Sequence, residues 1–247
     1  MADNTKIGHS KVCAMIPARL GSTRLKLKNL ALLNGKPLIS YSILAAQQAG
    51  VFDRIVINSD SSVFHKIANR YEVEFYKRPE HLGSSITKSD DVVLDFMQNH
   101  SAEAVVWVNP IAPLQTGKEI REAVEYFQKE QLDSLITVKD EQVHCIYQGK
   151  PVNFEETGKF AQTQELEAVQ PFVYSIMMWK TKSFIEAMKS QGHAFLSGKI
   201  GYYPVSKWSS IIIKTNHDLK LASYALMAVT EDCDVEYDDL VKPILNK

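Results

Sequence analysis

Strand-like and helix-like segments alternate through the first two-thirds of this 247-residue chain. Short apolar runs are followed by longer segments whose apolar residues recur at helical spacing. The expected strands are Val12–Ile16, Arg54–Asn58, Glu72–Tyr76, Ala104–Asn109 and Ser134–Val138, and the expected helices are 36–50, Ser62–Tyr71, Asp90–Asn99 and Lys118–Glu130. This alternation predicts an α/β fold of the Rossmann-like class, with a doubly wound and mostly parallel sheet.

The remainder of the chain is less regular. Residues 140–170 are polar and lack clear periodicity, which indicates an irregular hairpin or arm that projects from a single domain spanning 1–247. Val173–Trp179 and Ser209–Ile213 are predicted to be further strands. Asp218–Ala228 is predicted to be a closing helix, with Asp218 near its positive end.

Composition excludes several classes of function. Hydrophobic residues make up 45% and charged residues 23% of the chain, as in soluble globular proteins. The net charge of −1 gives no reason to expect a nucleic acid or an anionic membrane as partner. The three cysteines and seven histidines show no metal-ligand spacing. The polar N-terminus has no signal-peptide core, so we expect a cytoplasmic protein.

A basic loop follows the first expected strand. Pro17 ends the apolar run, and Gly21 and Ser22 allow the backbone to approach an anion closely. The same loop carries four cations, Arg19, Arg24, Lys26 and Lys28. Ligands gather at the carboxyl ends of the strands in such sheets. The loop is therefore predicted to bind a triphosphate.

Three other strand ends carry polar residues with two interpretations each. Asp60 suits a ribose or a metal, but capping of the helix that begins near Ser62 is favoured. Ser89 or Asp90 suits the N-cap of the next helix, and the loop before it suits recognition of a nucleobase. Asn109, which is followed by Pro110 and Pro113, suits a hydrogen bond to a substrate hydroxyl or a simple stiffened turn.

Five blocks of sequence, taken together, carry a family resemblance. They are residues 16–29, 35–43, 52–60, 78–82 and 113–123. In order and spacing they resemble the acylneuraminate cytidylyltransferases (CMP-sialic acid synthetases), which are related to the CMP-Kdo synthetases. The resemblance spans 12–228 and implies a nucleotide-diphospho-sugar transferase-like fold. It also implies transfer of CMP from CTP to a sugar acid with release of pyrophosphate, in a homodimer whose arm is 140–170.

The resemblance assigns site residues position by position. It implies nucleotide binding by Arg19, Ser22, Arg24, Lys28, Asn29, Arg78 and Ser89. It implies acceptor binding by Asn109, Gln115 and Ser175, and catalytic roles for Arg19 and Lys28. A catalytic role is also predicted for Lys214, from its charge and not from the family pattern.

The chain departs from the family pattern at the expected chemistry. The two aspartates that hold magnesium in the family correspond to Ile212 and Lys214, so no metal ligand is predicted and a need for Mg²⁺ stays open. Lys214 suits direct contact with the α-phosphate instead. The arginine that binds the sugar carboxylate corresponds to Val173, which indicates an atypical acceptor. Two hypotheses follow: an active cytidylyltransferase with an altered acceptor, or a degenerate homologue that binds a nucleotide or CMP-sugar without turnover.

Overall fold

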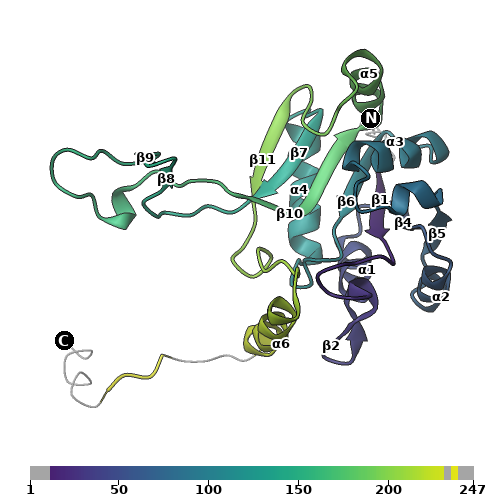
Figure 1. Ribbon diagram of the computed structural model, residues 1–247, viewed down its shortest axis with the longest axis horizontal. Coiled ribbons are helices and arrows are strands. Elements are labelled where there is room, and N and C mark those ends of the chain that lie inside the picture. The colour runs from purple at the N-terminus through teal and green to yellow at the C-terminus, as the bar shows by residue number, and fades with distance from the viewer. Residues whose placement is uncertain (1–11, 231–234, 239–247) are drawn as a thin grey trace, which may run out of the picture.

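A seven-stranded sheet forms the centre of the computed structural model, which describes residues 12–230 and 235–238 (Figure 1). The strand order is β11-β7-β10-β6-β1-β4-β5. The strands are β1 Val12–Ala18, β4 Arg54–Ser59, β5 Glu74–Lys77, β6 Ala104–Val108, β7 Ser134–Val138, β10 Phe172–Lys180 and β11 Ile200–Pro204. Strand β10 runs antiparallel to both of its neighbours, and the other pairs are parallel. The predicted α/β class with a mostly parallel sheet is confirmed.

Helices cover both faces of the sheet. One core lies between the sheet and α1 (Leu38–Ala49), α2 (Val63–Arg70) and α4 (Gly117–Lys129). The second core lies between the opposite face and α3 (Ser89–Asn99) and α5 (Thr181–Gln191). A third, smaller core lies under α6 (Asn216–Thr230). None of the helices in the described residues is long and apolar enough to cross a membrane.

Short elements complete the fold. The 3-10 helices are η1 Lys28–Leu30, η2 Glu80–Gly83 and η3 Thr163–Glu165, and two small ribbons pair β2 Leu32–Leu33 with β3 Lys36–Pro37 and β8 Ile146–Tyr147 with β9 Lys150–Pro151.

Local sequence explains the helix ends that position the site. Helix α1 follows Pro37 and stops at Gly50, which adopts φ +65°. That left-handed conformation favours glycine, because it has no Cβ. Helix α4 begins with a reciprocal capping box, in which the Thr116 side chain accepts from Glu119 N and the Glu119 carboxylate accepts from Thr116 N.

The segment 140–170 is an arm that extends away from the sheet, as predicted (Figure 1). It carries the β8–β9 hairpin and a small aromatic cluster of its own. The rings of His144 and Phe160 stack with centroids 4.1 Å apart, and Phe154 meets His144 edge-on at 5.0 Å. The arm exposes apolar side chains, among them Ile146 and Tyr147.

The prediction of a strand over Ser209–Ile213 is wrong. This segment is irregular, because the Ser209 hydroxyl donates to the Glu119 carboxylate and to the Leu114 carbonyl, and these bonds draw the backbone into a turn. The edge strand is β11 instead, which pairs with β7 from Ile200 to Pro204. Helix α5 was also not predicted.

Candidate active site

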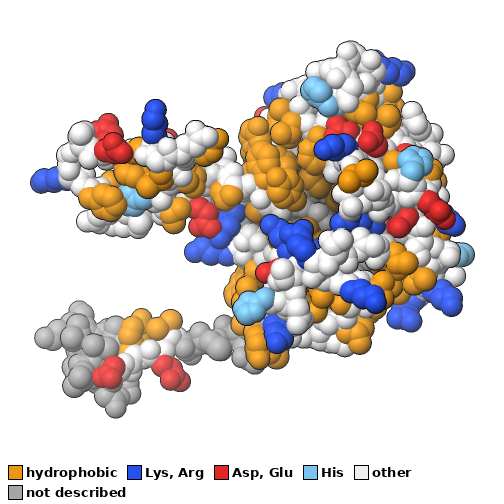
Figure 2. Space-filling model, viewed as in Figure 1, with side chains coloured by type: hydrophobic (Ala, Val, Ile, Leu, Met, Phe, Trp, Pro, Cys, Tyr) orange, Lys and Arg blue, Asp and Glu red, His pale blue; other side chains and the backbone are white. Residues whose placement is uncertain are grey.

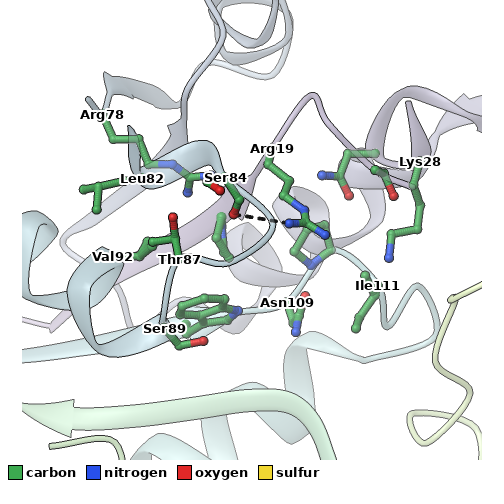
Figure 3. Close-up of a pocket in the computed structure, with 15 residues that line it drawn as sticks. Arg19, Lys28, Arg78, Leu82, Ser84, Thr87, Ser89, Val92, Asn109 and Ile111 are labelled. Atoms are coloured by element: carbon green, nitrogen blue, oxygen red, sulfur yellow. Dashed lines mark hydrogen bonds between the residues drawn. The ribbon is translucent and has the colours of Figure 1, made fainter. Parts of the chain in front are cut away.

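A pocket of about 220 Å³ lies at the carboxyl ends of β1, β5 and β6 (Figure 3). Its lining includes Arg19, Ser22, Lys28, Asn29, Arg78 and Ser89, which are all predicted nucleotide-binding residues. Arg24 is the one predicted nucleotide-binding residue outside the lining. The sheet thus brings together side chains that lie as far apart in sequence as Arg19 and Ser89.

Lys28 is the electrostatic centre of the basic loop. Its Nζ donates to the Ile213 carbonyl at 3.1 Å. Burial, together with the nearby positive charges of Arg24 and Arg19, lowers the pKa of Lys28 to about 8. A cation in this state is stabilised by an anion that enters the pocket.

Arg78 forms the opposite wall and is only 4% exposed. Its guanidinium donates to the Asn58 carbonyl at 3.4 Å and pairs with Asp60 at 3.7 Å. Burial lowers its pKa from the ordinary value. The Asp60 carboxylate also accepts from Leu20 N at 3.3 Å, so it ties the basic loop to Arg78. The expectation that Asp60 caps α2 is therefore wrong, since this carboxylate is turned toward the loop after β1.

Three buried polar atoms of the pocket lining lack a hydrogen-bond partner among the described residues. They are Asn29 Oδ1, Arg78 Nε and Trp107 Nε1. Each such atom costs about 1–3 kcal/mol when it stays unpaired. A ligand with both acceptors and donors would recover that free energy, so the pocket suits a polar molecule.

Trp107 is a pocket residue that sequence reasoning missed. It lies inside the apolar run of β6, where its side chain reads as core. Val106 and Val108 face the α1 and α4 layer, and side chains alternate between the two faces of a strand. This alternation is the one sequence signal that could have shown that Trp107 points to the opposite face of the sheet.

The expected cap at the start of α3 is absent. The capping position is Lys88, and no side chain caps this helix. Asp90 instead accepts from the backbone nitrogens of Ala194 and Phe195, at 2.7 and 2.9 Å. Ser89 and Thr87 line the pocket (Figure 3). The start of α3 is thus part of the pocket wall.

Of the three predicted acceptor residues, only Asn109 lines the pocket. Ser175 is fully buried, with its hydroxyl 3.1 Å from that of Thr137. Gln115 is 5% exposed and donates to Glu119 at 2.9 Å. Gln115 and Ser175 therefore lie outside the pocket lining, and their assignment to the acceptor stays a prediction.

Lys214 lies beside the pocket on the irregular segment before α6. Its side chain is exposed, and its positive charge helps to lower the pKa of Lys28. Its backbone nitrogen donates to Asp218 at 2.9 Å. Glu119 anchors the start of this segment, since its carboxylate accepts from Ser206 N and the Ser209 hydroxyl. These bonds also hold the pKa of Glu119 below its usual value, although its burial acts in the opposite direction.

The residues at the expected metal position do not fit magnesium. Ile212 and Lys214 offer no carboxylate oxygen, and Mg²⁺ requires oxygen ligands. Across the described parts of the chain, no group of three potential metal-ligating side chains comes together. Lys214 therefore gives this position a positive charge in place of the carboxylates that would bind a metal.

The lowered pKa of Lys28 predicts a pH dependence of anion binding. Lys28 loses its proton near pH 8 in the free protein, whereas a bound polyphosphate favours the protonated form. Affinity for CTP should thus be constant from about pH 7 to the pKa and then fall by up to about tenfold per pH unit. Calorimetric titrations at pH 7, 8, 9 and 10 would measure this. A flat profile over that range would contradict the assignment.

The lowered pKa of Lys28 makes the stability of the free protein rise with pH, whereas CTP affinity falls. The unfolded chain keeps Lys28 protonated up to its ordinary pKa near 10.5, so it binds more protons than the folded chain above pH 8. The contribution of Lys28 to the free energy of unfolding therefore rises with pH in that window. Stabilisation by CTP should fall over the same range.

Comparison with known proteins places the chain that forms this pocket in a family. The sequence model of the family described as cytidylyltransferase matches residues 13–208. The chain belongs to the cytidylyltransferase family. It is 30% identical over 220 residues to the N-acylneuraminate cytidylyltransferase of Streptococcus agalactiae serotype V, which covers 84% of this chain and 51% of that protein. It is 26% identical over 230 residues to post-translational flagellin modification protein B of Campylobacter coli, covering 88% of this chain and 95% of that protein.

The chain spans about half or less of the length of several relatives. Its matched region covers 29% to 51% of three N-acylneuraminate cytidylyltransferases. Among solved structures, CMP:2-keto-3-deoxy-manno-octonic acid synthetase complexed with CTP has a TM-score of 0.69 and 14% identity. That alignment covers 90% of this chain and all of the other. At this identity, the likeness shows a shared fold.

Proposed function

We propose that this member of the family transfers CMP from CTP to a sugar acid and releases pyrophosphate. The observation that carries the proposal is the pocket itself. It combines the cations Arg19, Lys28 and Arg78 with three unpaired buried polar atoms, at the sheet edge where α/β proteins bind ligands. Relatives whose names include N-acylneuraminate and pseudaminic acid support a sugar acid as acceptor.

In the proposed reaction, a hydroxyl oxygen of the acceptor forms a bond to the α-phosphorus of CTP. The bond between that phosphorus and the bridging oxygen to the β-phosphate breaks, and pyrophosphate leaves. The hydroxyl proton passes to solvent. Arg19 and Lys28 are assigned to the triphosphate, and Arg78 with Ser89 to the nucleoside. The chain's contribution is the positioning of two substrates and the stabilisation of negative charge as it develops.

Pyrophosphate release tests this proposal directly. The protein would be mixed with CTP, magnesium and a panel of 2-keto-3-deoxy sugar acids, and pyrophosphate would be measured over time. We expect release with at least one acid and with CTP in preference to ATP, GTP and UTP. Binding of CTP by calorimetry without release from any acid would support the second hypothesis, a homologue that binds nucleotide without turnover.

We also propose that the arm pairs two copies of the chain. The β8–β9 hairpin exposes Ile146 and Tyr147 at 63% and 69%, on a segment that extends away from its own domain (Figure 1). Apolar side chains in such a position suit contact with a second copy.

Substitution in the hairpin tests the pairing. We expect the unmodified protein to sediment with the mass of two chains, and Ile146→Asp/Tyr147→Asp to sediment as one chain at the same micromolar concentration. Lys150→Asp, on the neighbouring exposed strand, is the control for added negative charge. A single-chain mass for the unmodified protein would contradict the proposal.

A further inference from the structure

Three partly exposed aromatic side chains meet at the end of β10 that is nearest the pocket. Phe172, Tyr174 and Tyr202 are 38%, 45% and 44% exposed. The rings of Phe172 and Tyr202 stack with centroids 5.9 Å apart, and Tyr174 meets Phe172 edge-on at 5.9 Å. We name this group the aromatic corner. Figure 2 shows hydrophobic side chains gathered over β10, β7 and β11, beside a group of Lys and Arg side chains.

A bulge in β10 creates the aromatic corner. Ile176 and Met178 face the core under α1 and α4, and strict alternation would direct Tyr174 and Phe172 toward that same core. The pairing of β10 with β7 instead shifts register between Phe172 and Met177. Such bulges re-aim side chains and occur often beside active sites.

The stacking of Phe172 on Tyr202 shows to which face of the sheet the register shift turns Phe172. Tyr202 pairs in register with Ile136, and Ile136 belongs to the core under α3 and α5. Because Phe172 stacks on Tyr202, it lies on that face of the sheet. The pocket residue Trp107 belongs to the same face. The bulge thus turns the aromatic corner to the face that carries the pocket.

The fold holds the bulge with dedicated hydrogen bonds. Tyr174 adopts φ +59°, a conformation that costs a bulky residue about 1–3 kcal/mol. The Tyr174 carbonyl accepts from Asn109 Nδ2, and the Ser175 carbonyl accepts from Asn109 N, both at 2.9 Å. The Thr137 hydroxyl bonds the backbone nitrogen and carbonyl of Ile176 at 3.1 and 3.0 Å. Asn109 therefore both lines the pocket and fixes Tyr174.

The distance from the pocket suits a single extended ligand. Trp107, Met177, Ile136 and Tyr202 are cross-strand neighbours in one row over β6, β10, β7 and β11. Three strand spacings separate the ends of this row, which is about 14 Å. A nucleotide in the pocket would leave the aromatic corner within reach of a sugar joined to its α-phosphate.

We propose that the aromatic corner is the specificity site for the acceptor and that it binds an acylamido group of the sugar acid. This inference rests on the proposed function. Aromatic faces suit the acyl methyl, and the hydroxyls of Tyr174 and Tyr202 suit the polar amide. Val173, at the position where the resemblance places a carboxylate-binding arginine, is buried and uncharged. In the proposed site, apolar contact with the acyl group takes over part of the acceptor recognition that an arginine–carboxylate pair provides in the family that the chain resembles.

The test uses Tyr174→Gly, which removes the ring while glycine tolerates the positive φ. Tyr174→Phe keeps the ring, and Tyr224→Ala removes a 70% exposed tyrosine on α6 as the matched control. The probes are N-acetylneuraminic acid and 2-keto-3-deoxy-manno-octonic acid, which has no acylamido group. Saturation-transfer NMR with CTP present would report contact of the acetyl methyl with the protein.

We expect a strong methyl signal in the unmodified protein, in Tyr174→Phe and in Tyr224→Ala, and a several-fold weaker one in Tyr174→Gly. The KM for N-acetylneuraminic acid should rise about tenfold in Tyr174→Gly, with the Kd for CTP unchanged. An equal methyl signal in Tyr174→Gly, or a preference for the acid without the acylamido group, would overturn the inference. So would loss of the two-chain mass in Tyr174→Gly with the methyl signal intact, because the corner would then be a subunit contact.

Failure of this inference differs from failure of the proposed function. Pyrophosphate release without methyl contact would leave CMP transfer standing and remove the aromatic corner from it. Methyl contact that depends on Tyr174, without release from any acid, would retain the corner as a binding site in a protein without turnover.

Discussion

Lys28→Met is expected to weaken CTP binding by about 10²-fold, the magnitude of a lost charge-assisted contact in a partly buried site. Burial of Lys28 and the nearby charges of Arg24 and Arg19 leave its ammonium group poorly compensated in the free protein. A triphosphate would supply the missing negative charge. Calorimetric titration with CTP at pH 7 would measure the change.

The same variant has a second signature that separates binding from damage to the fold. Methionine removes a desolvated cation, so we expect the melting temperature of the free protein to stay the same or rise. The increase in melting temperature on addition of CTP should shrink. Lys26→Met is the matched control, since Lys26 is exposed on the same loop and lies outside the pocket lining. Equal CTP affinity in the two variants would remove Lys28 from the nucleotide site.

The sequence predicts the pocket well where local signals suffice. The basic loop is encoded by neighbouring residues, and its place after a buried strand follows from the α/β alternation. Pro37 and Gly50 likewise mark the ends of α1 through their own backbone preferences. Such features depend on a few adjacent residues, so one sequence is enough to find them.

What the sequence does not predict depends on contacts between distant residues. Ser209 looks like part of an apolar strand, but its bond to Glu119, 90 positions away, produces a turn. Ser175 looks available to a substrate until Thr137 is placed beside it. The bulge that turns Tyr174 toward the pocket face requires Asn109, which directly follows strand β6. Only the register of the sheet brings these partners together.

The segment that carries Lys214 shows how such contacts prepare the site. Glu119 holds the segment at Ser206 and Ser209, and Ile213 N donates to the Ile111 carbonyl at 2.8 Å. The Ile213 carbonyl then accepts from Lys28. The chain thus places a cation next to the triphosphate loop from a segment almost 190 residues away. In the resemblance, an aspartate occupies this position, so the local charge is reversed.

Lys214→Met is expected to lower turnover by about 10²-fold, as for loss of one electrostatic contact made to the transition state. Lys214→Arg keeps the charge and should retain a substantial share of the rate, although its fork places the charge differently. Lys220→Met, an exposed cation on α6, is the control. The measurement is the initial rate of pyrophosphate release at saturating CTP and acceptor. Equal rates in the Lys214→Met and Lys220→Met variants would exclude this role.

A pH profile shows whether Lys214 acts through its charge. After burial and the charges of Arg24 and Arg19, Lys214 makes the smallest contribution to the low pKa of Lys28, so its removal should raise that pKa slightly and move the alkaline loss of CTP affinity to slightly higher pH. Lys214→Arg should leave the profile where it is, since the repulsion persists. A reduced rate without this displacement would mean that Lys214 supports the segment mechanically. A reduced rate together with the displacement places its charge beside Lys28, where the α-phosphate of CTP is proposed to react.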